Sequence, residues 1–218
     1  MEVMETPVTV VILAAGLGTR MKSHKAKVLH RAGGKTLVEH AVDTALALTS
    51  AERVFVVVGH QAERVRAIVS TPGIGFIEQT EQLGTGHALL AGREALSHLD
   101  GYLAIVYGDG PLLRAATVRS LIETLEASEA AGALLSADMP DPNGYGRVLR
   151  GVSNRVTAVV EQKAATPSNW RFAKPTWAST AIAPTCSGGT RAKCAPTIPR
   201  TNITSPTWSR YSTGPDIT

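Results

Sequence analysis

Short apolar runs alternate along the chain with stretches in which apolar residues recur every three or four positions. The runs are continuous rather than alternating, which is typical of strands buried on both faces of a parallel sheet. They predict strands over residues 8–14, 53–58, 75–77, 102–107, 133–137, 147–149 and 156–160. The periodic stretches between them predict helices over residues 37–48, 62–69, 86–96 and 115–130.

This alternation of strands and helices predicts an α/β fold with a Rossmann-like, mostly parallel twisted sheet and helices on both faces. Ligands of such sheets bind at the carboxyl ends of the strands, beside the point where the strand order reverses. The sequence contains no internal repeat, and in particular no hexapeptide repeat that would build a left-handed β-helix. Functional residues are therefore expected in the segments that follow the strands.

The composition changes at residue 172. From there to residue 218 the chain has no Leu, Val, Glu or Gln, and it holds half of the 12 prolines. Five of the 22 basic and one of the 18 acidic residues lie in this segment, which leaves 17 of each before it. The net charge of +4 therefore belongs to the segment 172–218. The neutral remainder gives no reason to expect nucleic acid as a partner.

Features of membrane or exported proteins are not found. No run of 18 apolar residues occurs, so we expect no transmembrane helix and no membrane partner. Residues 1–7 are acidic and lead into an apolar strand, unlike a secretory signal peptide or an Arg-rich transit peptide. We expect a cytoplasmic protein.

The first predicted strand leads into a glycine-containing loop, Ala14-Ala15-Gly16-Leu17-Gly18-Thr19-Arg20-Met21. Small residues let the backbone approach a ligand, and successive N–H groups can bind an anion. Arg20 adds a forked cation suited to phosphate, with Lys22 and Lys27 nearby. Met21 stands where a dinucleotide fingerprint or a Walker A loop requires glycine. The loop is thus either another kind of phosphate-binding loop or a simple strand-to-helix turn.

Two more segments follow predicted strands. Residues 79–88, Gln-Thr-Glu-Gln-Leu-Gly-Thr-Gly-His-Ala, form either a loop with Thr85 as helix N-cap or a base-recognition loop in which Gln79 meets uracil. Asp109 follows the strand 102–107, where it suits either Mg²⁺ next to a phosphate site or the N-cap of the next helix. The six histidines show no metal-ligand spacing.

Together these segments resemble the sugar-1-phosphate nucleotidyltransferases. The resemblance is strongest to the uridylyltransferase domain of the bifunctional N-acetylglucosamine-1-phosphate uridylyltransferase/glucosamine-1-phosphate acetyltransferase family. It rests on residues 13–21 with Lys27-Val28-Leu29, on residues 79–88, on Tyr-Gly-Asp-x-Pro-Leu at 107–112 and on residues 159–164. Two departures stand out: Ala26 replaces the family's usual Pro and should loosen the loop, and Gly110 replaces a larger residue.

The resemblance implies an activity and a site. It implies transfer of UMP from UTP to N-acetylglucosamine 1-phosphate, giving UDP-N-acetylglucosamine and pyrophosphate for cell-envelope precursor synthesis, with Mg²⁺ as cofactor. The implied catalytic residues are Arg20 and Lys27, and the implied metal ligand is Asp109. The implied substrate-binding residues are Leu13, Ala14, Ala15, Gly16, Gln79, Gly84, Thr85, Tyr107, Gly108, Gly146 and Glu161. Two alternatives remain open: a catalytically impaired nucleotide-binding remnant, and a nucleotidyltransferase for another sugar 1-phosphate.

The resemblance ends near Lys163. In the family an Asn-x-Gly-Ile/Val-Tyr strand follows, whose Asn is the second Mg²⁺ ligand, and then a Glu-Tyr-Tyr-Leu-Thr-Asp segment and a β-helix domain. None of them appears here as written. We therefore expect an incomplete nucleotidyltransferase domain over residues 1–171 and a disordered Thr/Ser/Pro-rich tail over residues 172–218. We do not expect the family's homotrimer, because it depends on the β-helix.

The genetic code suggests an origin for the tail. If the codons from Phe172 onward are read two bases later, codon choices exist that yield Arg-Glu-Thr-Asn-Val-Gly-Ile-Tyr-Cys-Tyr. The same shift can turn residues 200–208 into His-Glu-Tyr-Tyr-Leu-Thr-Asp-Met. Both family segments are recovered in order, so we hypothesise that the tail is a frameshift product. A natural low-complexity tail is the alternative, and sequencing the gene distinguishes the two.

Overall fold

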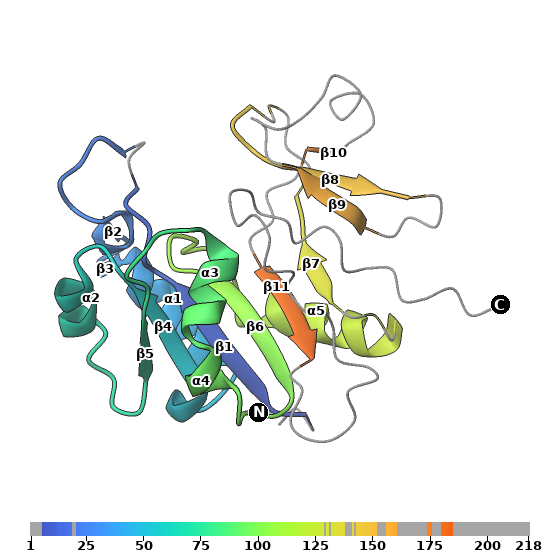
Figure 1. Ribbon diagram of the computed structural model, residues 1–218, viewed down its shortest axis with the longest axis horizontal. Helices are drawn as coiled ribbons and strands as arrows, with labels where there is room; N and C mark the ends of the chain where they lie inside the picture. Colours follow the sequence, from blue (N-terminus) through green and yellow to red (C-terminus); the bar gives the residue numbers. More distant parts are fainter. Residues whose placement is uncertain are drawn as a thin grey trace. The chain divides into compact units, whose positions relative to one another are not determined.

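The computed structural model describes residues 6–18, 21–128, 130, 132–137, 141, 143–151, 156–160, 174–175 and 180–184 (Figure 1). Its contacts divide the chain into two compact units. The first comprises Met1–Ala133 with Thr180–Cys194, and the second comprises Leu134–Ser179 with Ala195–Thr218. Each unit is described below by itself.

The elements up to residue 128 follow the predicted alternation of strands and helices. The strands are β1 (Val8–Leu13), β2 (Arg31–Ala32), β3 (Lys35–Thr36), β4 (Val54–Val58), β5 (Gly75–Glu78) and β6 (Tyr102–Tyr107). The α-helices are α1 (Leu37–Leu46), α2 (Ala62–Ile68), α3 (Thr85–Ala91), α4 (Arg93–Leu96) and α5 (Ala115–Ser128). Two 3₁₀ turns, η2 (Lys27–Leu29) and η3 (Ala51–Arg53), complete this part.

The main sheet has the order β5-β4-β1-β6-β11-β7, in which β7 is Ala133–Leu135 and β11 is Thr180–Pro184. Strands β5, β4, β1 and β6 run parallel, and β11 runs antiparallel to β6. From β1 the chain proceeds to β4 and β5 on one side and then returns to β6 on the other. The strand order therefore reverses between β1 and β6, whose carboxyl ends flank the expected ligand position.

The two faces of this sheet are covered by different helices. Even-numbered residues of β1 and β4, such as Ile12 and Val56, belong to one apolar cluster with α1 and α5. The odd-numbered Val11 and Val57 belong to a second cluster with Ala88 of α3. Because successive side chains of a strand point to opposite faces, the clusters lie on opposite sides of the sheet. In Figure 1, α3 lies in front of the strands and α1 behind them. The predicted α/β fold with helices on both faces is confirmed.

Local differences from the predicted elements have identifiable causes. The single helix expected over 86–96 is interrupted at Gly92, because glycine favours the helix less than most residues, and α3 and α4 are separate. A Cβ at this position would lie 2.5 Å from Ile77 Cδ1, which explains why the residue is glycine. The β2–β3 hairpin was not predicted. Its two-residue turn is Gly33-Gly34, with φ of +57° and +89°, a pair of residues typical of tight hairpins that could have revealed it.

The second unit contains a small antiparallel sheet of order β10-β8-β9. Its strands are β8 (Arg147–Arg150), β9 (Val156–Val160) and β10 (Lys174–Pro175). Strands β10 and β11 both lie in the segment 172–218, for which we expected disorder, so the structure differs from that expectation at these residues. In β11 the backbone pairs with β6 from Thr180 opposite Val106 to Pro184 opposite Tyr102. The rest of the segment lies outside the described residues.

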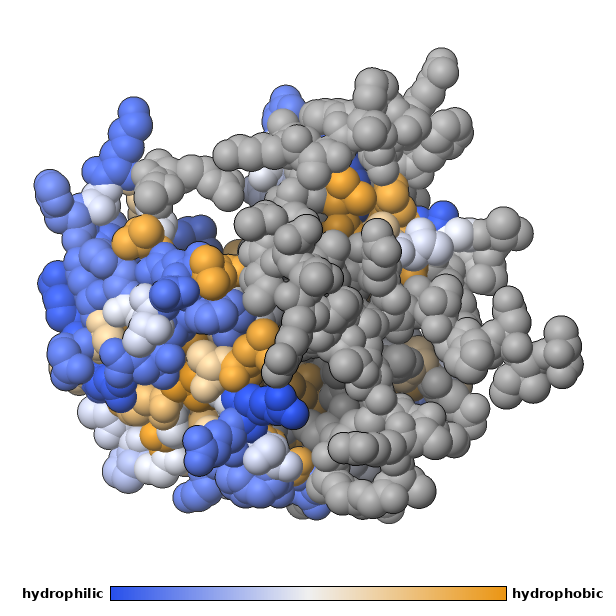
Figure 2. Space-filling model, in the orientation of Figure 1, coloured by the Kyte–Doolittle hydropathy of each residue, from blue (hydrophilic) through white to orange (hydrophobic). Residues whose placement is uncertain are grey.

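The surface visible in Figure 2 is mainly hydrophilic over the described residues, with separate hydrophobic patches. Among the described residues, the large hydrophobic side chains that are exposed are Leu17 (48%), Met21 (43%), Leu83 (47%) and Leu112 (90%). All four lie in loops that follow β1, β5 or β6. Within the described part of the chain, no helix has the length and apolar character needed to cross a membrane.

Candidate active site

Three loops leave the carboxyl ends of parallel strands and carry most of the residues that the sequence singled out. They follow β1 (residues 14–26), β5 (residues 79–84) and β6 (residues 108–114). The first and third loops begin side by side, because β1 and β6 are neighbours: Leu13 pairs with Tyr107, and Gly108 N donates to Leu13 O at 3.0 Å. The residues of these two loops therefore meet where the strand order reverses.

The loop after β1 is anchored to the sheet at its start and leaves it at Gly16. Ala14 N donates to Val57 O at 2.9 Å, and both Ala14 and Ala15 are buried. Gly18 has φ +64°, and Met21 N donates to Gly18 O at 3.0 Å. A Cβ on Gly18 would lie 2.7 Å from Lys27 Cβ, so the loop passes directly over Lys27. Glycine is therefore required at position 18 by both the backbone angle and the contact.

Gly16 and Gly108 differ in whether packing explains the absence of a side chain. A Cβ on Gly108 would lie 3.1 Å from Leu13 O, so glycine here is explained by the close approach of β1 and β6. A Cβ on Gly16 would meet no atom within 4 Å, and this residue has no left-handed φ. Packing does not explain glycine at position 16. The absent side chain leaves open space beside a backbone that could bind phosphate.

Lys27, the residue that follows the first loop, forms an ion pair with Asp109 of the third loop. Lys27 Nζ lies 2.5 Å from Asp109 Oδ2, with side chains 42% and 25% exposed. Asp109 lies in a turn in which Gly110 N donates to Tyr107 O at 3.2 Å. The next helix begins only at Ala115, so the alternative role of Asp109 as its N-cap is excluded. A cation and an anion, both accessible to solvent, thus stand together at the reversal of strand order.

The loop after β5 is held by the amides of two glutamines. Gln79 is buried, and its Nε2 donates to Gly84 O at 3.1 Å and lies 3.2 Å from His87 Nδ1. Gln82 Nε2 donates to Ala15 O at 2.9 Å, which joins this loop to the loop after β1. Helix α3 begins at Thr85, with Gly84 as its N-cap residue and no side-chain cap, so the alternative in which Thr85 is the N-cap is wrong.

Several implied site residues are not placed in this group. Arg20 and Glu161 lie outside the described residues. Gly146 belongs to the second unit, where a Cβ on it would lie 3.4 Å from Val160 O of the neighbouring strand. The described residues that gather at the carboxyl edge of the main sheet are Leu13, Ala14, Ala15, Gly16, Lys27, Gln79, Gly84, Thr85, Tyr107, Gly108 and Asp109.

The structure also reveals two residues that the sequence reasoning missed, Gln82 and Gln61. Gln61 has a left-handed backbone, φ 57° and ψ 38°, and its side chain bonds to residues of the loop after β1. It lies three residues beyond β4, so its place at the carboxyl edge could have been predicted. Its backbone conformation could not, because glutamine gives no sequence signal for positive φ.

The electrostatics of the described residues fit a magnesium ion that arrives with a triphosphate. Mg²⁺ in such sites is usually held by one or two carboxylates together with substrate phosphates. Asp109 offers one carboxylate, next to the open loop at Gly16. In the described part of the chain, no group of three or more His, Cys, Asp or Glu side chains could hold a metal by itself. The donor set therefore suits a metal shared with substrate.

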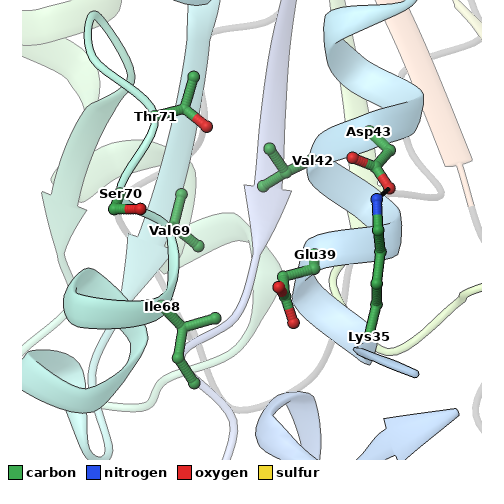
Figure 3. Close-up of a pocket in the computed structure, with 8 residues that line it drawn as sticks. All are labelled: Lys35, Glu39, Val42, Asp43, Ile68, Val69, Ser70 and Thr71. Carbon is green, nitrogen blue, oxygen red and sulfur yellow. Dashed lines mark hydrogen bonds and ion pairs between the residues drawn. The ribbon is translucent and has the colours of Figure 1, made fainter.

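A separate hollow of about 180 Å³ lies away from these loops, between α1 and the segment after α2 (Figure 3). Its lining residues are Lys35, Glu39, Val42, Asp43, Ile68, Val69, Ser70 and Thr71. Its charged side chains already have partners. Lys35 Nζ donates to Asp43 Oδ2 at 2.6 Å, which raises the pKa of Lys35, and Thr36 donates to Glu39, which lowers the pKa of that carboxyl. No predicted site residue lines it, so the hollow is not the candidate active site.

A parallel sheet with a glycine loop, a lysine and an aspartate at the reversal of its strand order is an arrangement suited to binding a nucleotide. Comparison with known families agrees: residues 10–199 match the MobA-like NTP transferase domain, and the chain belongs to this family of nucleotidyltransferases. Its curated relatives include proteins named Bifunctional protein GlmU. That of Solibacter usitatus is 67% identical over 167 residues, or 77% of this chain and 36% of the relative. That of Nostoc sp. is 45% identical over 164 residues, or 74% of this chain and 36% of the relative.

The chain therefore spans about a third of the length of the curated relatives that it matches. Solved structures show the same fold at low identity. A protein described as a glucose-1-phosphate thymidylyltransferase from Bacillus anthracis, crystallised with sucrose, has a TM-score of 0.61 at 15% identity, covering 82% of this chain and 72% of that one. A UDP-glucose pyrophosphorylase with bound UDP-glucose has a TM-score of 0.60 at 15% identity, covering 81% of this chain and 75% of that one.

Proposed function

We propose that the chain transfers UMP from UTP to N-acetylglucosamine 1-phosphate and releases pyrophosphate. The observation that carries this proposal is the Lys27–Asp109 pair at the reversal of strand order, beside a loop left open at Gly16. Membership of the NTP transferase family and the 67% identity to a GlmU protein support the substrate assignment. We assign the same reaction to the cytoplasm, as a step in the synthesis of cell-envelope precursors.

The chemistry is a displacement at phosphorus. An oxygen of the sugar phosphate attacks the α-phosphorus of UTP, the bond from that phosphorus to the bridging oxygen breaks, and pyrophosphate leaves. The nucleophile is already an anion, so no general base is needed. Positioning and charge neutralisation then supply most of the rate enhancement.

The residues of the loops have different proposed roles in this reaction. Backbone N–H groups of residues 16–18 face the phosphates, and Lys27 exchanges its contact with Asp109 for the oxygens of the leaving pyrophosphate. Arg20 is proposed to act with Lys27 on the same group. Asp109 is the residue that would hold Mg²⁺, which supplies neutralisation of the phosphate charge when bound.

We assign base recognition to the Gln79 side chain. Its Nε2 is committed to Gly84 O and His87, so the amide oxygen Oε1 is the group that remains for the base. An acceptor oxygen suits the N3–H of uracil, whereas cytosine presents a lone pair at that position. Gly84 and Thr85 line the same loop. Gly146 and Glu161 are proposed to contact the sugar.

The experiment is pyrophosphate release from UTP in the presence of Mg²⁺, with and without N-acetylglucosamine 1-phosphate. Release that requires both substrates and ceases on chelation supports the proposal. Protection of the protein against heat by UTP without release would instead indicate a nucleotide-binding remnant. Pyrophosphate release only with a different sugar phosphate or triphosphate in a substrate panel would assign the protein a different substrate.

A further inference from the structure

Gln61 occupies an unusual position between α2 and the loop that carries Lys27. It is one of two non-glycine residues with positive φ in the described part of the chain, at φ 57°. A non-glycine residue in this region carries a conformational cost of about 1 kcal/mol, which persists only where surrounding contacts hold it. The contacts of its side chain show what holds it.

The Gln61 amide bonds to the loop through both of its polar atoms. Its Nε2 donates to His24 O at 2.5 Å, and its Oε1 accepts from Ala26 N at 3.3 Å. Arg64, on the next turn of α2, donates from Nη1 to the same Oε1 at 3.1 Å and orients the amide. Ala26 is fully buried and is the N-cap residue of η2, where its own side chain provides no cap.

These contacts end one residue before Lys27. Lys27 is the first residue of η2, and its Nζ is the atom that reaches Asp109. Within the loop, Ser23 Oγ accepts from Lys25 N at 3.1 Å, and Ala26 provides no side-chain cap for η2. The Gln61 amide holds the loop from outside, since it binds one carbonyl and one N–H on either side of Lys25.

We propose that Gln61 is a positioning residue that fixes the loop 24–26 and thereby places Lys27 against the triphosphate. Its importance for catalysis rests on the proposed function, whereas its effect on the loop does not. The strained backbone at position 61 is tolerated because the left-handed turn aims the amide at the loop. Ala26 has φ −53°, a value that proline also adopts, so a proline there could fix the loop without the amide.

The decisive variant is Gln61→Gly in the full chain, because it removes the amide and relieves the backbone at the same time. We expect a lower or unchanged melting temperature, because relief of the backbone at most offsets the buried N–H of Ala26 that is left unpaired. We also expect faster hydrogen exchange in a peptide spanning residues 22–29 and about a tenfold rise in the KM for UTP. A residue with a merely structural role would lower the melting temperature and leave KM unchanged. Glu63→Gln, at a side chain of α2 that is 92% exposed, is the matched control and should change none of the three.

A second variant tests the mechanism of the effect. Ala26→Pro should fix the loop by its ring, so that adding it to Gln61→Gly restores most of the lost affinity for UTP, and the two changes are then non-additive. Additive losses would overturn the proposal, as would normal exchange or a normal KM in Gln61→Gly. A wild-type protein that neither binds nor turns over UTP would refute the proposed function instead. In that case the hydrogen exchange of residues 22–29 alone decides whether Gln61 fixes the loop.

Discussion

The main sheet and the loops at its carboxyl edge are built on different principles. Residues at the centre of β1 and β4, such as Val11, Ile12 and Val56, are completely buried in continuous apolar contact. The loops contain the exposed Leu17 and Leu112, glycines at special positions and a small number of polar links such as Lys27–Asp109. The sheet is therefore held by many apolar contacts at once, whereas the loops depend on a few polar contacts. Changes in the two regions should separate stability from activity.

The largest effect is expected at Asp109. Asp109→Ala should lower Mg²⁺-dependent pyrophosphate release about 10³-fold, because the only carboxylate assigned to the metal is lost. The Lys27–Asp109 pair is partly exposed, so its loss should change the free energy of unfolding by less than about 1 kcal/mol. Steady-state kinetics and urea unfolding measure the two quantities, and Asp109→Asn keeps the shape without the charge. Turnover close to the wild-type rate in either variant would refute the role of Asp109.

The reverse outcome is expected in the sheet. Ile12→Ala removes three carbons from a side chain with no exposed surface and should lower the free energy of unfolding by about 3 kcal/mol. The KM for UTP of the folded fraction should stay unchanged, because Ile12 belongs to the apolar cluster with α1 and α5 and not to the loops. Ile12→Val, costing about 1 kcal/mol, is the graded control in the same urea titration. If Ile12→Ala lowered the affinity for UTP without lowering stability, the contrast between the sheet and the loops would be wrong.

The accuracy of the predictions from sequence also differs between the sheet and the loops. Apolar runs predicted β1, β4 and β6 within one or two residues, because burial on both faces leaves a pattern that depends on local residues alone. The glycine loop and Asp109 were predicted from their places after strands, and the ion pair brings them together. The Gln61 and Gln82 contacts could not be predicted. These contacts join residues that are 35 and 67 positions apart in the sequence. The sequence alone does not distinguish such a glutamine from one whose amide faces solvent. The need for glycine at position 92 likewise depends on Ile77, which lies in another element.

The two loop glycines give a sharper comparison within one segment. Gly18→Ala should lower the free energy of unfolding by about 1–2 kcal/mol and raise the KM for UTP, because φ is +64° and the new Cβ would displace Lys27. Gly16→Ala should leave stability within about 0.5 kcal/mol, since its Cβ meets no atom, and should still raise the KM. Thermal unfolding and UTP kinetics on both variants provide the check. An unchanged KM in Gly16→Ala would show that the open space there is not used by the nucleotide.

The smallest effect is expected at the start of α1, on the stable side of the comparison. Thr36 and Glu39 form a capping box in which the Thr36 hydroxyl and N–H both donate to Glu39 Oε2, at 2.7 and 2.6 Å. These bonds lower the pKa of Glu39 from its ordinary value of 4.5. The carboxylate therefore stabilises the fold at pH values above 4.5, and this contribution is lost as the pH falls through the lowered value.

Glu39→Gln should accordingly lower the free energy of unfolding by about 0.5 kcal/mol at neutral pH, because Glu39 is partly exposed and screened by solvent. The difference from wild type should shrink as the pH falls below 4.5 and vanish once the carboxyl is protonated in both the folded and the unfolded chain. Urea titrations of both proteins across this range measure the difference, and UTP turnover at neutral pH should not change. A difference that stays constant with pH would mean that the glutamine acts through packing at the hollow rather than through loss of the capping charge.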